Sequence, residues 1–249
     1  MTDRIVVLGA GYGGCAAVRS LEDELEDTDT ELVWISEEDY HLLLHESHRC
    51  IRTPDARASV TIPVADIKSA DTEFVQATVT GLDTDARTVE LADHEDVDYD
   101  YVVVGLGSQT AFYGIDGLEE HALTLKSLGD ALAINEHLTE AARESSRSDP
   151  AQVVIGGGGL TGIQVAGEIA AWADEQDAEM DVHLVERSDQ IFPGHDHEFQ
   201  GAIRNQLEAH DVEIDTGAAM TGVEESEIQF DERDPMDYDV LVWAGGVTG

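Results

Sequence analysis

The chain has 249 residues, of which 42% are hydrophobic, so it can bury one large core or two modest ones and is not a disordered protein. Its 54 acidic and 13 basic side chains give a net charge of −41, which argues against nucleic acid and anionic lipid headgroups as partners. The acids are spread along the whole chain. They fit either a cation-binding protein or a halophile surface, and we favour the halophile surface, whose self-repulsion would be screened by concentrated salt.

Cysteine content and hydropathy limit the cellular setting. Cys15 and Cys50 are the only cysteines, and no C-x-x-C motif is present, so neither a disulfide framework nor a structural zinc site is expected. The first strand is predicted to start at about residue 4, which leaves no room for a signal peptide, and no apolar run has the length of a membrane span. We expect the chain to be cytoplasmic.

The first pattern along the chain is an apolar run, Ile5–Leu8, that leads into Gly9, Gly11 and Gly14 with the spacing G-x-G-x-x-G. The first glycine allows a tight turn from strand to helix, the second lets a pyrophosphate approach the backbone, and the third lets the helix pack closely on the strand. Free N–H groups of a helix that begins near Tyr12 would hold the phosphates. Alone the motif is weak, because glycine-rich turns also occur where nothing binds.

A second strand is predicted at Glu31–Ser36, directly before Glu37. Glu37 lies 28 residues after Gly9, beyond the usual distance of about 20 to the acid that binds the ribose, and an acidic run before the strand would lengthen this connection. We predict Glu37 as a ribose ligand of the first site. Cys15 is predicted to be a small buried residue in the first turn of the helix.

Residues 40–70 show no regular pattern and contain His41, His45 and His48. Three histidines near Glu46 suggest a metal, but no H-E-x-x-H motif is present. We therefore interpret them as loop or solvent-facing residues and predict no metal site.

Strand patterns follow at 74–79, 82–91 and 97–104. They predict a small β-meander that returns to the main sheet, where the last strand ends on glycines. A helix is predicted at Leu128–Ala142 from its apolar spacing.

The opening pattern then occurs a second time. Four glycines follow a short apolar strand, and Gly157, Gly159 and Gly162 fit G-x-G-x-x-G, while a register that starts at Gly156 is the alternative. After a helix, a strand ends on Glu186, which lies 29 residues beyond Gly157, against 28 residues in the first copy. Two copies with matching spacing are far more specific than one, and they predict two dinucleotide sites.

The remaining elements are a predicted helix at 199–207, strands at 212–215 and 228–230, and a last apolar strand that ends on Gly245 and Gly246. This last strand resembles 101–107, but no element follows to cover it. We therefore expect the sequence to be truncated.

Two dinucleotide sites in one chain indicate an oxidoreductase that uses a flavin and a nicotinamide cofactor. We predict an α/β fold with two Rossmann-like dinucleotide-binding domains, each a three-layer ββα arrangement, in which the NAD domain is inserted into the FAD domain. The FAD-binding domain would begin with 1–117, the NAD(H)-binding domain would take 118–237, and 238–249 would return to the FAD-binding domain as a strand. Glu186 would accept from the ribose 2′-OH and favour NADH, a preference that the neighbouring Arg187 weakens.

Three stretches resemble the type II NADH dehydrogenases, which are single-subunit flavin NADH:quinone oxidoreductases. The stretches are Asp39–Leu43, Gly114–Leu138 and Leu160–Glu168, and the similarity covers the whole chain as far as Gly246. The middle stretch, GIDGLEEHALTLKSLGDALAINEHL, is the most specific of the three. The glycine motifs are shared with all disulfide-reductase-like flavoproteins and indicate the fold more than the substrate.

The resemblance implies FAD and NADH as cofactors and a quinone as electron acceptor. It places FAD on Gly9, Gly11, Tyr12, Gly13 and Gly14, near Gly107 and Ser108, with adenine contacts from the backbone of Val79. It places NADH on Gly157, Gly159, Thr161, Gly162 and Glu186, with Gly245 and Gly246 between the two cofactors. Glu168 matches a family glutamate close to the nicotinamide, and we predict an auxiliary catalytic role for it.

The chain departs from the family pattern at three places. Ser36 stands where the family usually has Asp, Gln164 stands where it commonly has Glu, and His45–Ser47 replaces an apolar segment. The resemblance also implies a second FAD motif, a quinone pocket and membrane-docking helices beyond Gly249. The full-length protein would then be peripheral at the inner face of the cell membrane, as a monomer or a homodimer.

Two other functions stay open on the residues alone. A sulfide:quinone oxidoreductase or a related flavoprotein needs a pair of redox cysteines facing the flavin, whereas Cys15 is predicted to pack in a helix and Cys50 has no evident partner. A non-catalytic nucleotide-binding redox module is the other alternative. The visible spectrum of the full-length protein would distinguish an enzyme, whose flavin band NADH bleaches, from a colourless module.

Overall fold

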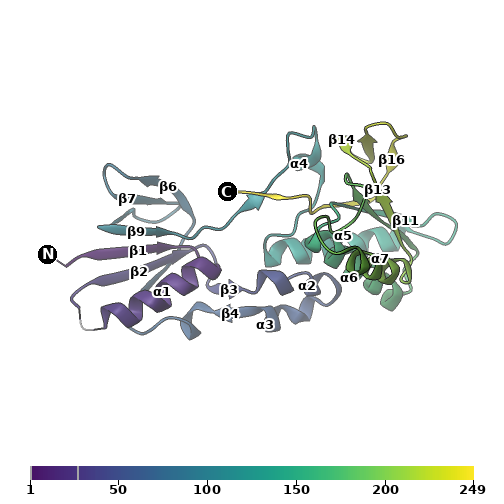
Figure 1. The fold of residues 1–249 in the computed structure, drawn as a ribbon. Helices are drawn as coiled ribbons and strands as arrows, with labels where there is room; N and C mark the ends of the chain where they lie inside the picture. Colours follow the sequence, from purple (N-terminus) through teal and green to yellow (C-terminus); the bar gives the residue numbers. More distant parts are fainter. Residues whose placement is uncertain (1, 27) are drawn as a thin grey trace. The chain divides into compact units, whose positions relative to one another are not determined.

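The structure is a computed structural model that describes residues 2–26 and 28–249. The chain divides into two compact units, Met1–Leu43 with Ala58–Ser108 and Leu44–Arg57 with Gln109–Gly249. Each unit carries one copy of the glycine pattern. Figure 1 labels the helices and strands of the chain. Within the described ranges, no helix combines the length and the apolar character that crossing a lipid bilayer requires.

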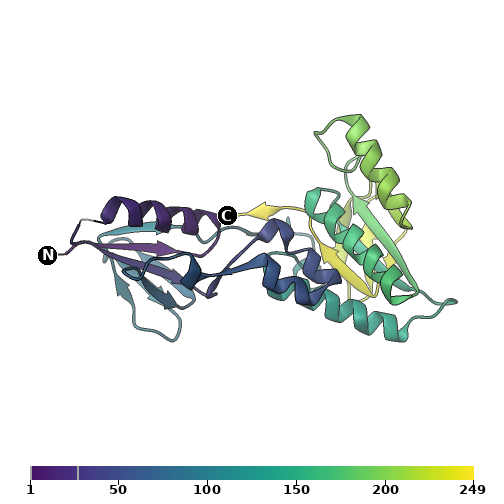
Figure 2. The ribbon, with the colours of Figure 1, turned by 90° about the horizontal axis from the view of Figure 1, so that it is seen from below.

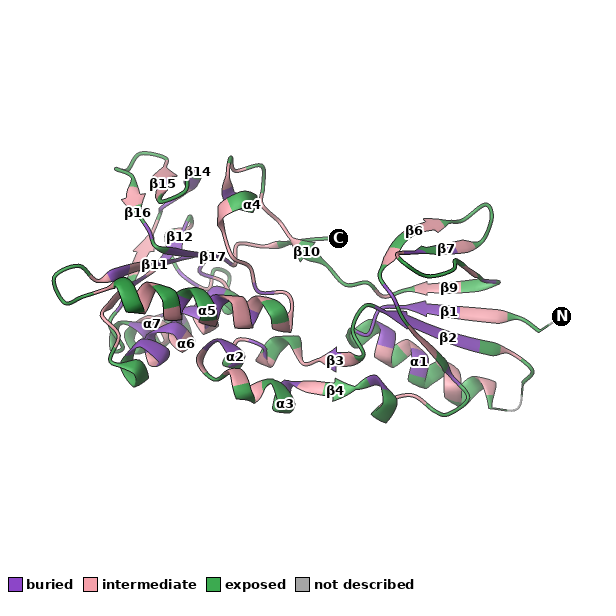
Figure 3. Cartoon of the chain, turned by 180° about the vertical axis from the view of Figure 1, so that it is seen from behind, coloured by how far each residue is buried: buried purple, intermediate pink, exposed green. Residues whose placement is uncertain are grey.

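The first unit is built on a parallel sheet with the strand order β5-β2-β1-β9. Its strands are β1 (Arg4–Leu8), β2 (Glu31–Ser36), β5 (Glu73–Gln76) and β9 (Tyr101–Val104). In Figure 3 the inner strands β1 and β2 are mostly buried, whereas β9 at the edge is exposed at both ends. Runs of consecutive apolar residues in β1 and β2 fit strands that are covered on both faces.

Helix α1 (Tyr12–Leu25) covers one face of this sheet (Figure 2). Val7, Val18 and Trp34 pack together between them. The antiparallel meander of β6 (Val79–Asp83), β7 (Thr88–Leu91) and β8 (Val97–Asp98) covers the other face, over Val6 and Leu8. Successive residues of β1 therefore serve opposite layers, as a pleated strand requires. The predicted three-layer ββα arrangement and the predicted meander are confirmed.

The second unit repeats this plan. Its parallel sheet has the order β13-β12-β11-β17 and consists of β11 (Ala151–Gly156), β12 (Met180–Glu186), β13 (Val212–Thr216) and β17 (Val240–Trp243). Helices α5 (Leu128–Glu144), α6 (Leu160–Gln176) and α7 (His197–Glu208) pack on its strands. Ser127 and Asp130 form a capping box at the start of α5, which fixes where that helix begins.

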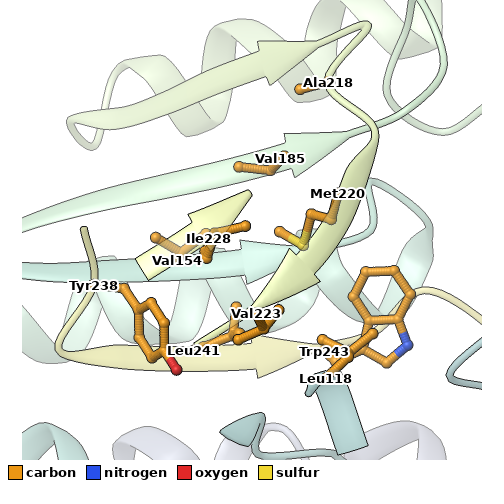
Figure 4. Close-up of a cluster of buried hydrophobic side chains, with 10 residues drawn as sticks. All are labelled: Leu118, Val154, Val185, Ala218, Met220, Val223, Ile228, Tyr238, Leu241 and Trp243. Carbon is orange, nitrogen blue, oxygen red and sulfur yellow. The ribbon is translucent and has the colours of Figure 1, made fainter. Parts of the chain in front are cut away.

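A small antiparallel sheet covers the other face of the second parallel sheet. It contains β14 (Met220–Val223), β15 (Glu227–Phe230) and β16 (Met236–Asp237). Figure 4 shows the core between the two sheets, where Val154, Val185 and Leu241 of the parallel strands meet side chains of the small sheet. Leu118 of α4 (Leu118–His121) belongs to the same cluster. The sequence did not predict β14.

The predicted return of 238–249 to the first unit is wrong. β17 pairs with β11, and β18 (Val247–Thr248) pairs with β10 (Gln109–Thr110), so all of these strands lie in the second unit. Each sheet takes its fourth strand from its own unit, β9 in the first and β17 in the second. Residues 109–117 also belong to the second unit, where the Val223 amide donates to the Asp116 carbonyl, so the boundary lies at 108 instead of 117.

Residues 40–70 are more regular than their sequence suggested. β3 (Tyr40–Leu42) pairs with β4 (Thr61–Pro63), followed by the turn η3 (Val64–Asp66). Between the two strands lie four short helical elements, η1 (Leu44–Glu46), α2 (Arg49–Arg52), η2 (Pro54–Ala56) and α3 (Arg57–Val60). Elements of three or four residues are too short to show a periodic pattern.

Segment 44–57 belongs to the second unit although the chain on both sides of it belongs to the first. Its helix α2 packs on α5 and α6, and Cys50 and Ile51 are fully buried there. The Asn135 side-chain amide of α5 donates to the Ile51 carbonyl at 2.8 Å.

Candidate functional site

The first glycine turn connects β1 to α1 with little space to spare. Gly9 has φ +93°, and its N–H donates to the Ile35 carbonyl at 2.7 Å. A Cβ on Gly9 would overlap the Gly105 carbonyl, and a Cβ on Gly14 would overlap the Gly9 carbonyl. The first and third glycines of the motif are therefore required by the turn and by the packing of helix on strand.

The second turn has the same geometry. Gly157 has φ +109° and donates to the Val185 carbonyl at 2.8 Å, and a Cβ on Gly162 would overlap the Gly157 carbonyl. Gly157 therefore corresponds to Gly9, and Gly162 to Gly14. The register of the second motif is the one that begins at Gly157.

The middle glycines face open space at the start of each helix. Gly11 and Gly159 are the N-cap residues of α1 and α6, with nearly equal dihedral angles (φ −72°, ψ −176° and φ −76°, ψ −176°). As glycines, neither residue has a side chain that could cap its helix. A Cβ on Gly159 would have no neighbour within 4 Å, and a Cβ on Gly11 would meet only the Gly105 carbonyl oxygen, at 4.0 Å. A helix start with a glycine N-cap and open space beside it fits a pyrophosphate.

The run of four glycines in the second copy has separate local causes. A Cβ on Gly156 would overlap the ring of Trp243 at the end of β17, and a Cβ on Gly158 would lie 3.0 Å from the Cβ of Glu186. Gly156 and Gly158 therefore make room for side chains, while Gly157 and Gly159 belong to the turn itself.

Glu186 is 7% exposed at the end of β12. One of its carboxylate oxygens accepts from the Gly158 N–H and the other from the Ser188 N–H, both at 2.7 Å. The acid thus ties the glycine turn to the loop that follows β12. A carboxylate has about four lone-pair sites, so each oxygen can still accept from a ligand hydroxyl.

The position equivalent to Glu186 in the first copy is occupied by Ser36. Gly9 and Gly157 bind the carbonyls of Ile35 and Val185, and Ser36 and Glu186 each follow directly. Glu37 lies one residue further on and is exposed, and its own carbonyl accepts from the Gln76 side chain at 3.0 Å. Its role as ribose ligand stays a prediction.

His41 was missed as a site residue by the sequence analysis. It is buried and not solvent-facing, and its Nδ1 donates to the Ala10 carbonyl inside the first glycine turn at 2.8 Å. Its ring also packs edge to face against the Tyr12 ring, with 4.7 Å between the two ring centroids. In the second copy the Phe192 N–H binds the equivalent carbonyl, that of Gly158, at 2.7 Å. The stretch Asp39–Leu43, which carried the family resemblance, was the available signal.

The other residues predicted for FAD lie in the first unit. Val79 is half-buried at the start of β6 and packs on the core below the meander. Gly107, with φ +81°, and Ser108 are exposed in the segment after β9. Their contacts with a cofactor stay predictions.

The second unit contains a cavity of about 540 Å³ beside its glycine turn. Five of the predicted residues line it: Gly157, Gly159, Glu186, Gly245 and Gly246. Thr161 lies in the exposed first turn of α6, and Gly162 is buried beneath the turn. The sequence analysis did not identify the other lining side chains, which include Tyr113, Met220, Pro193 and Trp243.

Glu168 does not line this cavity. It points from α6 to α2, where Arg52 Nε lies 2.9 Å from one carboxylate oxygen and His48 Nε2 lies 3.9 Å from the other. The oxygen near Arg52 is buried and its approach to Nε does not meet hydrogen-bond geometry, so charge holds this pair. Burial lowers the pKa of His48, against the opposing effect of Glu168. The predicted auxiliary role of Glu168 stays a prediction.

The histidines and cysteines were the candidates for metal or redox chemistry. Over residues 2–26 and 28–249, no group of three or more His, Cys, Asp or Glu side chains could hold a metal ion. Cys15 is half-buried and donates to the Ala10 carbonyl at 3.3 Å, while Cys50 is fully buried. Burial raises the pKa of both thiols, whereas a redox-active cysteine needs a lowered pKa. This argues against the sulfide:quinone oxidoreductase alternative.

Comparison with known proteins gives relatives along the whole chain. It is 26% identical to the type II NADH:quinone oxidoreductase of Staphylococcus saprophyticus over 262 residues and 27% identical to that of Staphylococcus haemolyticus over 263 residues. Each alignment covers 99% of this chain and 65% of the relative, so the chain spans about two thirds of the length of these curated relatives.

Solved structures share the fold. The NDH2 of Plasmodium falciparum in complex with NADH aligns with a TM-score of 0.86 and 17% identity, over 99% of this chain and 55% of that one. The sulfide:quinone oxidoreductase of Aquifex aeolicus aligns with a TM-score of 0.77 and 17% identity, over 97% and 58%. At such identities the likeness shows the two Rossmann-like domains and no more.

The family comparison covers both glycine turns at once. The sequence profile of the pyridine nucleotide-disulphide oxidoreductases matches residues 3–249, which include β1 and β11 with their turns and the closing strand of each sheet. Because this one profile matches nearly the whole chain, including both parallel sheets, the chain belongs to the pyridine nucleotide-disulphide oxidoreductase family.

Proposed function

We propose that the chain works as an FAD-dependent NADH dehydrogenase that passes electrons to a quinone. The observation that carries this proposal is the pair of equivalent glycine turns, each leading into a helix whose N-cap is a glycine, in two units of one chain. Similarity to relatives named type II NADH:quinone oxidoreductase supports the choice of substrates.

In this proposal the first unit binds FAD. The pyrophosphate would lie on the backbone of the first turn, formed by Gly9, Gly11, Tyr12, Gly13 and Gly14. Glu37 would bind the ribose, the backbone of Val79 the adenine, and Gly107 with Ser108 the rest of the cofactor. His41 would hold the turn in shape through its hydrogen bond to Ala10.

The second unit would bind NADH in its 540 Å³ cavity. The turn with Gly157, Gly159, Thr161 and Gly162 would receive the pyrophosphate, while Glu186 accepts from the ribose hydroxyls. A carboxylate repels a 2′-phosphate, so NADH is favoured over NADPH, although Arg187 in the cavity wall reduces the difference. Gly245 and Gly246 would face the nicotinamide half.

Bound FAD would supply the redox chemistry, as the acceptor of a hydride from NADH and the source of electrons for the quinone. The residues of this chain would bind and orient the reactants, because such a transfer depends on alignment more than on a side-chain acid or base. Glu168 would act indirectly, by holding α2 against α6 through Arg52.

The test is anaerobic visible spectroscopy of the full-length protein loaded with FAD. We expect NADH to bleach the flavin band and a soluble quinone to restore it. Two matched variants assign the cofactors: Gly11→Ala should lose FAD, and Gly159→Ala should keep FAD but lose reduction by NADH. Both glycines have negative φ, and a methyl group added to either would have no neighbour closer than 4.0 Å, so the variants should fold. A loaded protein whose flavin NADH does not reduce would refute the proposal.

We also propose that the full-length protein is peripheral at the inner face of the cell membrane, where NADH and a membrane quinone are both accessible, and that it forms a homodimer. Cell fractionation tests the first point, since a high-salt or carbonate wash should release the protein from membranes. Sedimentation velocity of the released protein tests the second.

A further inference from the structure

One end of the cavity in the second unit is aromatic. Trp243, labelled in Figure 4, is buried at the end of β17, and its Nε1 donates to the Ala111 carbonyl at 2.9 Å. Its ring fills the space that a Cβ on Gly156 or on Gly245 would need. The hydrogen bond thus holds the indole in place, and the two glycines leave room for its ring.

Tyr113 is the second aromatic residue at this end. It lines the cavity, yet 65% of it is exposed. Its hydroxyl occupies the place that a Cβ on Gly246 would take, and Gly246 has φ +153°. Gly246 therefore provides the space in which the tip of the Tyr113 side chain lies.

The backbone of Tyr113 is in a conformation that its side chain does not favour. The Ile115 N–H donates to the Phe112 carbonyl at 3.1 Å, which closes a turn whose central residues are Tyr113 and Gly114. Both have positive φ, +54° and +71°. Asn and Gly suit such positions, whereas a bulky aromatic residue is strained there. Strain of this kind at the wall of a cavity points to a function of the side chain.

The direction of the proposed ligand identifies that function. If the adenosine ribose lies at Glu186 and the pyrophosphate at Gly157 and Gly159, the nicotinamide half falls among the remaining lining residues. These include the aromatic end with Tyr113 and Trp243. We propose that Tyr113 is an aromatic cap that stacks on the nicotinamide ring and positions it in the cavity. This inference rests on the proposed binding of NADH in the second unit.

The proposal is tested with two ligands that differ in the nicotinamide ring. Isothermal titration calorimetry of the FAD-loaded protein would measure the affinities of NAD⁺ and of ADP-ribose, which lacks the ring. We expect Tyr113→Asn to weaken NAD⁺ binding about three- to tenfold, as the loss of an aromatic stack implies, and to leave ADP-ribose binding unchanged. Tyr113→Phe, which keeps the ring, should bind both ligands like the unaltered protein.

Two controls separate stacking from effects on the fold. Tyr113→Asn should melt at the same or a higher temperature, because Asn suits the turn better than Tyr. Tyr101→Ala removes an aromatic ring that is 61% exposed on β9 of the first unit and does not line the cavity, so it should change neither affinity. If both Tyr113→Asn and Tyr113→Gly fail to fold, the ring has a structural role and the proposal is wrong.

The titrations distinguish an error in the role of Tyr113 from an error in the proposed NADH site. Equal weakening of NAD⁺ and ADP-ribose by Tyr113→Asn, or no change in either, would overturn the aromatic cap and leave the NADH site intact. If the unaltered protein bound neither ligand, the NADH site itself would be refuted.

Discussion

Two neighbouring glycines of α1 differ in what an added methyl group would meet. At Gly14 it would overlap the Gly9 carbonyl, whereas at Gly13 it would have no neighbour within 4 Å. We expect Gly14→Ala to lower the free energy of unfolding by about 1–3 kcal/mol, the usual cost of overpacking. Gly13→Ala should leave it unchanged or raise it by up to about 1 kcal/mol, since Ala favours the helix. Urea unfolding of both variants checks this, and equal losses would contradict the assigned packing.

Some residues of the site could be predicted because a local sequence pattern marks them, and others could not. The glycines and Glu186 could be predicted, because their spacing along one strand–turn–helix–strand unit is fixed by the turn itself. His41 could not be placed, since its hydrogen bond to Ala10 depends on how a later loop folds back. Tyr113 and Trp243 come from segments 130 residues apart, which the pairing of β10 with β18 and the hydrogen bond from Trp243 to Ala111 bring together.

The ion pair between α2 and α6 leads to a prediction about the stability of the protein. Arg52 lies at 2.9 Å from Glu168, whose side chain is 15% exposed. We expect Arg52→Ala to cost about 1–3 kcal/mol of unfolding free energy, because it leaves a mostly buried carboxylate without its main partner. Thermal unfolding measures the loss.

Arg147 provides the matched control for this prediction. It also pairs with a glutamate, Glu179 at 3.3 Å, but its side chain is 92% exposed. Arg147→Ala should therefore change stability little, as exposed ion pairs usually do. Equal effects of the two variants would show that the pair of Arg52 and Glu168 does not hold α2 in place.

The long elements followed from the sequence and the short ones did not. Helices α1, α5 and α6 and the inner strands of both sheets have enough residues to show their period. The elements of 40–70 and strand β14 are only three or four residues long. The strand that pairs with β17 could not be predicted either. The apolar sequence of β17 suits the edge of either parallel sheet, and only the folded chain shows that β17 pairs with β11.

The net charge of −41 sets an expectation for the whole molecule. The Debye length falls from about 10 Å at 0.1 M salt to about 3 Å at 1 M, which screens most repulsion between surface carboxylates. We expect the thermal midpoint to rise by about 10 °C between low and molar KCl, which corresponds to roughly 3 kcal/mol for a chain of this size. Differential scanning calorimetry measures the shift.

The choice of cation separates the two explanations of the acidic surface. Screening depends on ionic strength, so NaCl, KCl and tetramethylammonium chloride should stabilise the protein to similar extents. Stabilisation by one cation only, at low concentration, would instead indicate specific cation binding. A midpoint that does not change with salt would contradict both.

The discontinuous make-up of the second unit affects how the protein can be dissected or grafted. Residues 109–249 expressed alone would lack α2, so the apolar surfaces of α5 and α6 under Cys50 and Ile51 would be bare and Asn135 would lose its acceptor. A second unit cut at residue 108 should therefore aggregate. A chimera that transplants this unit into another protein needs two pieces of chain, 44–57 together with 109–249, and a circular permutant that joins them would be the simplest way to obtain the unit as a stable, independent protein.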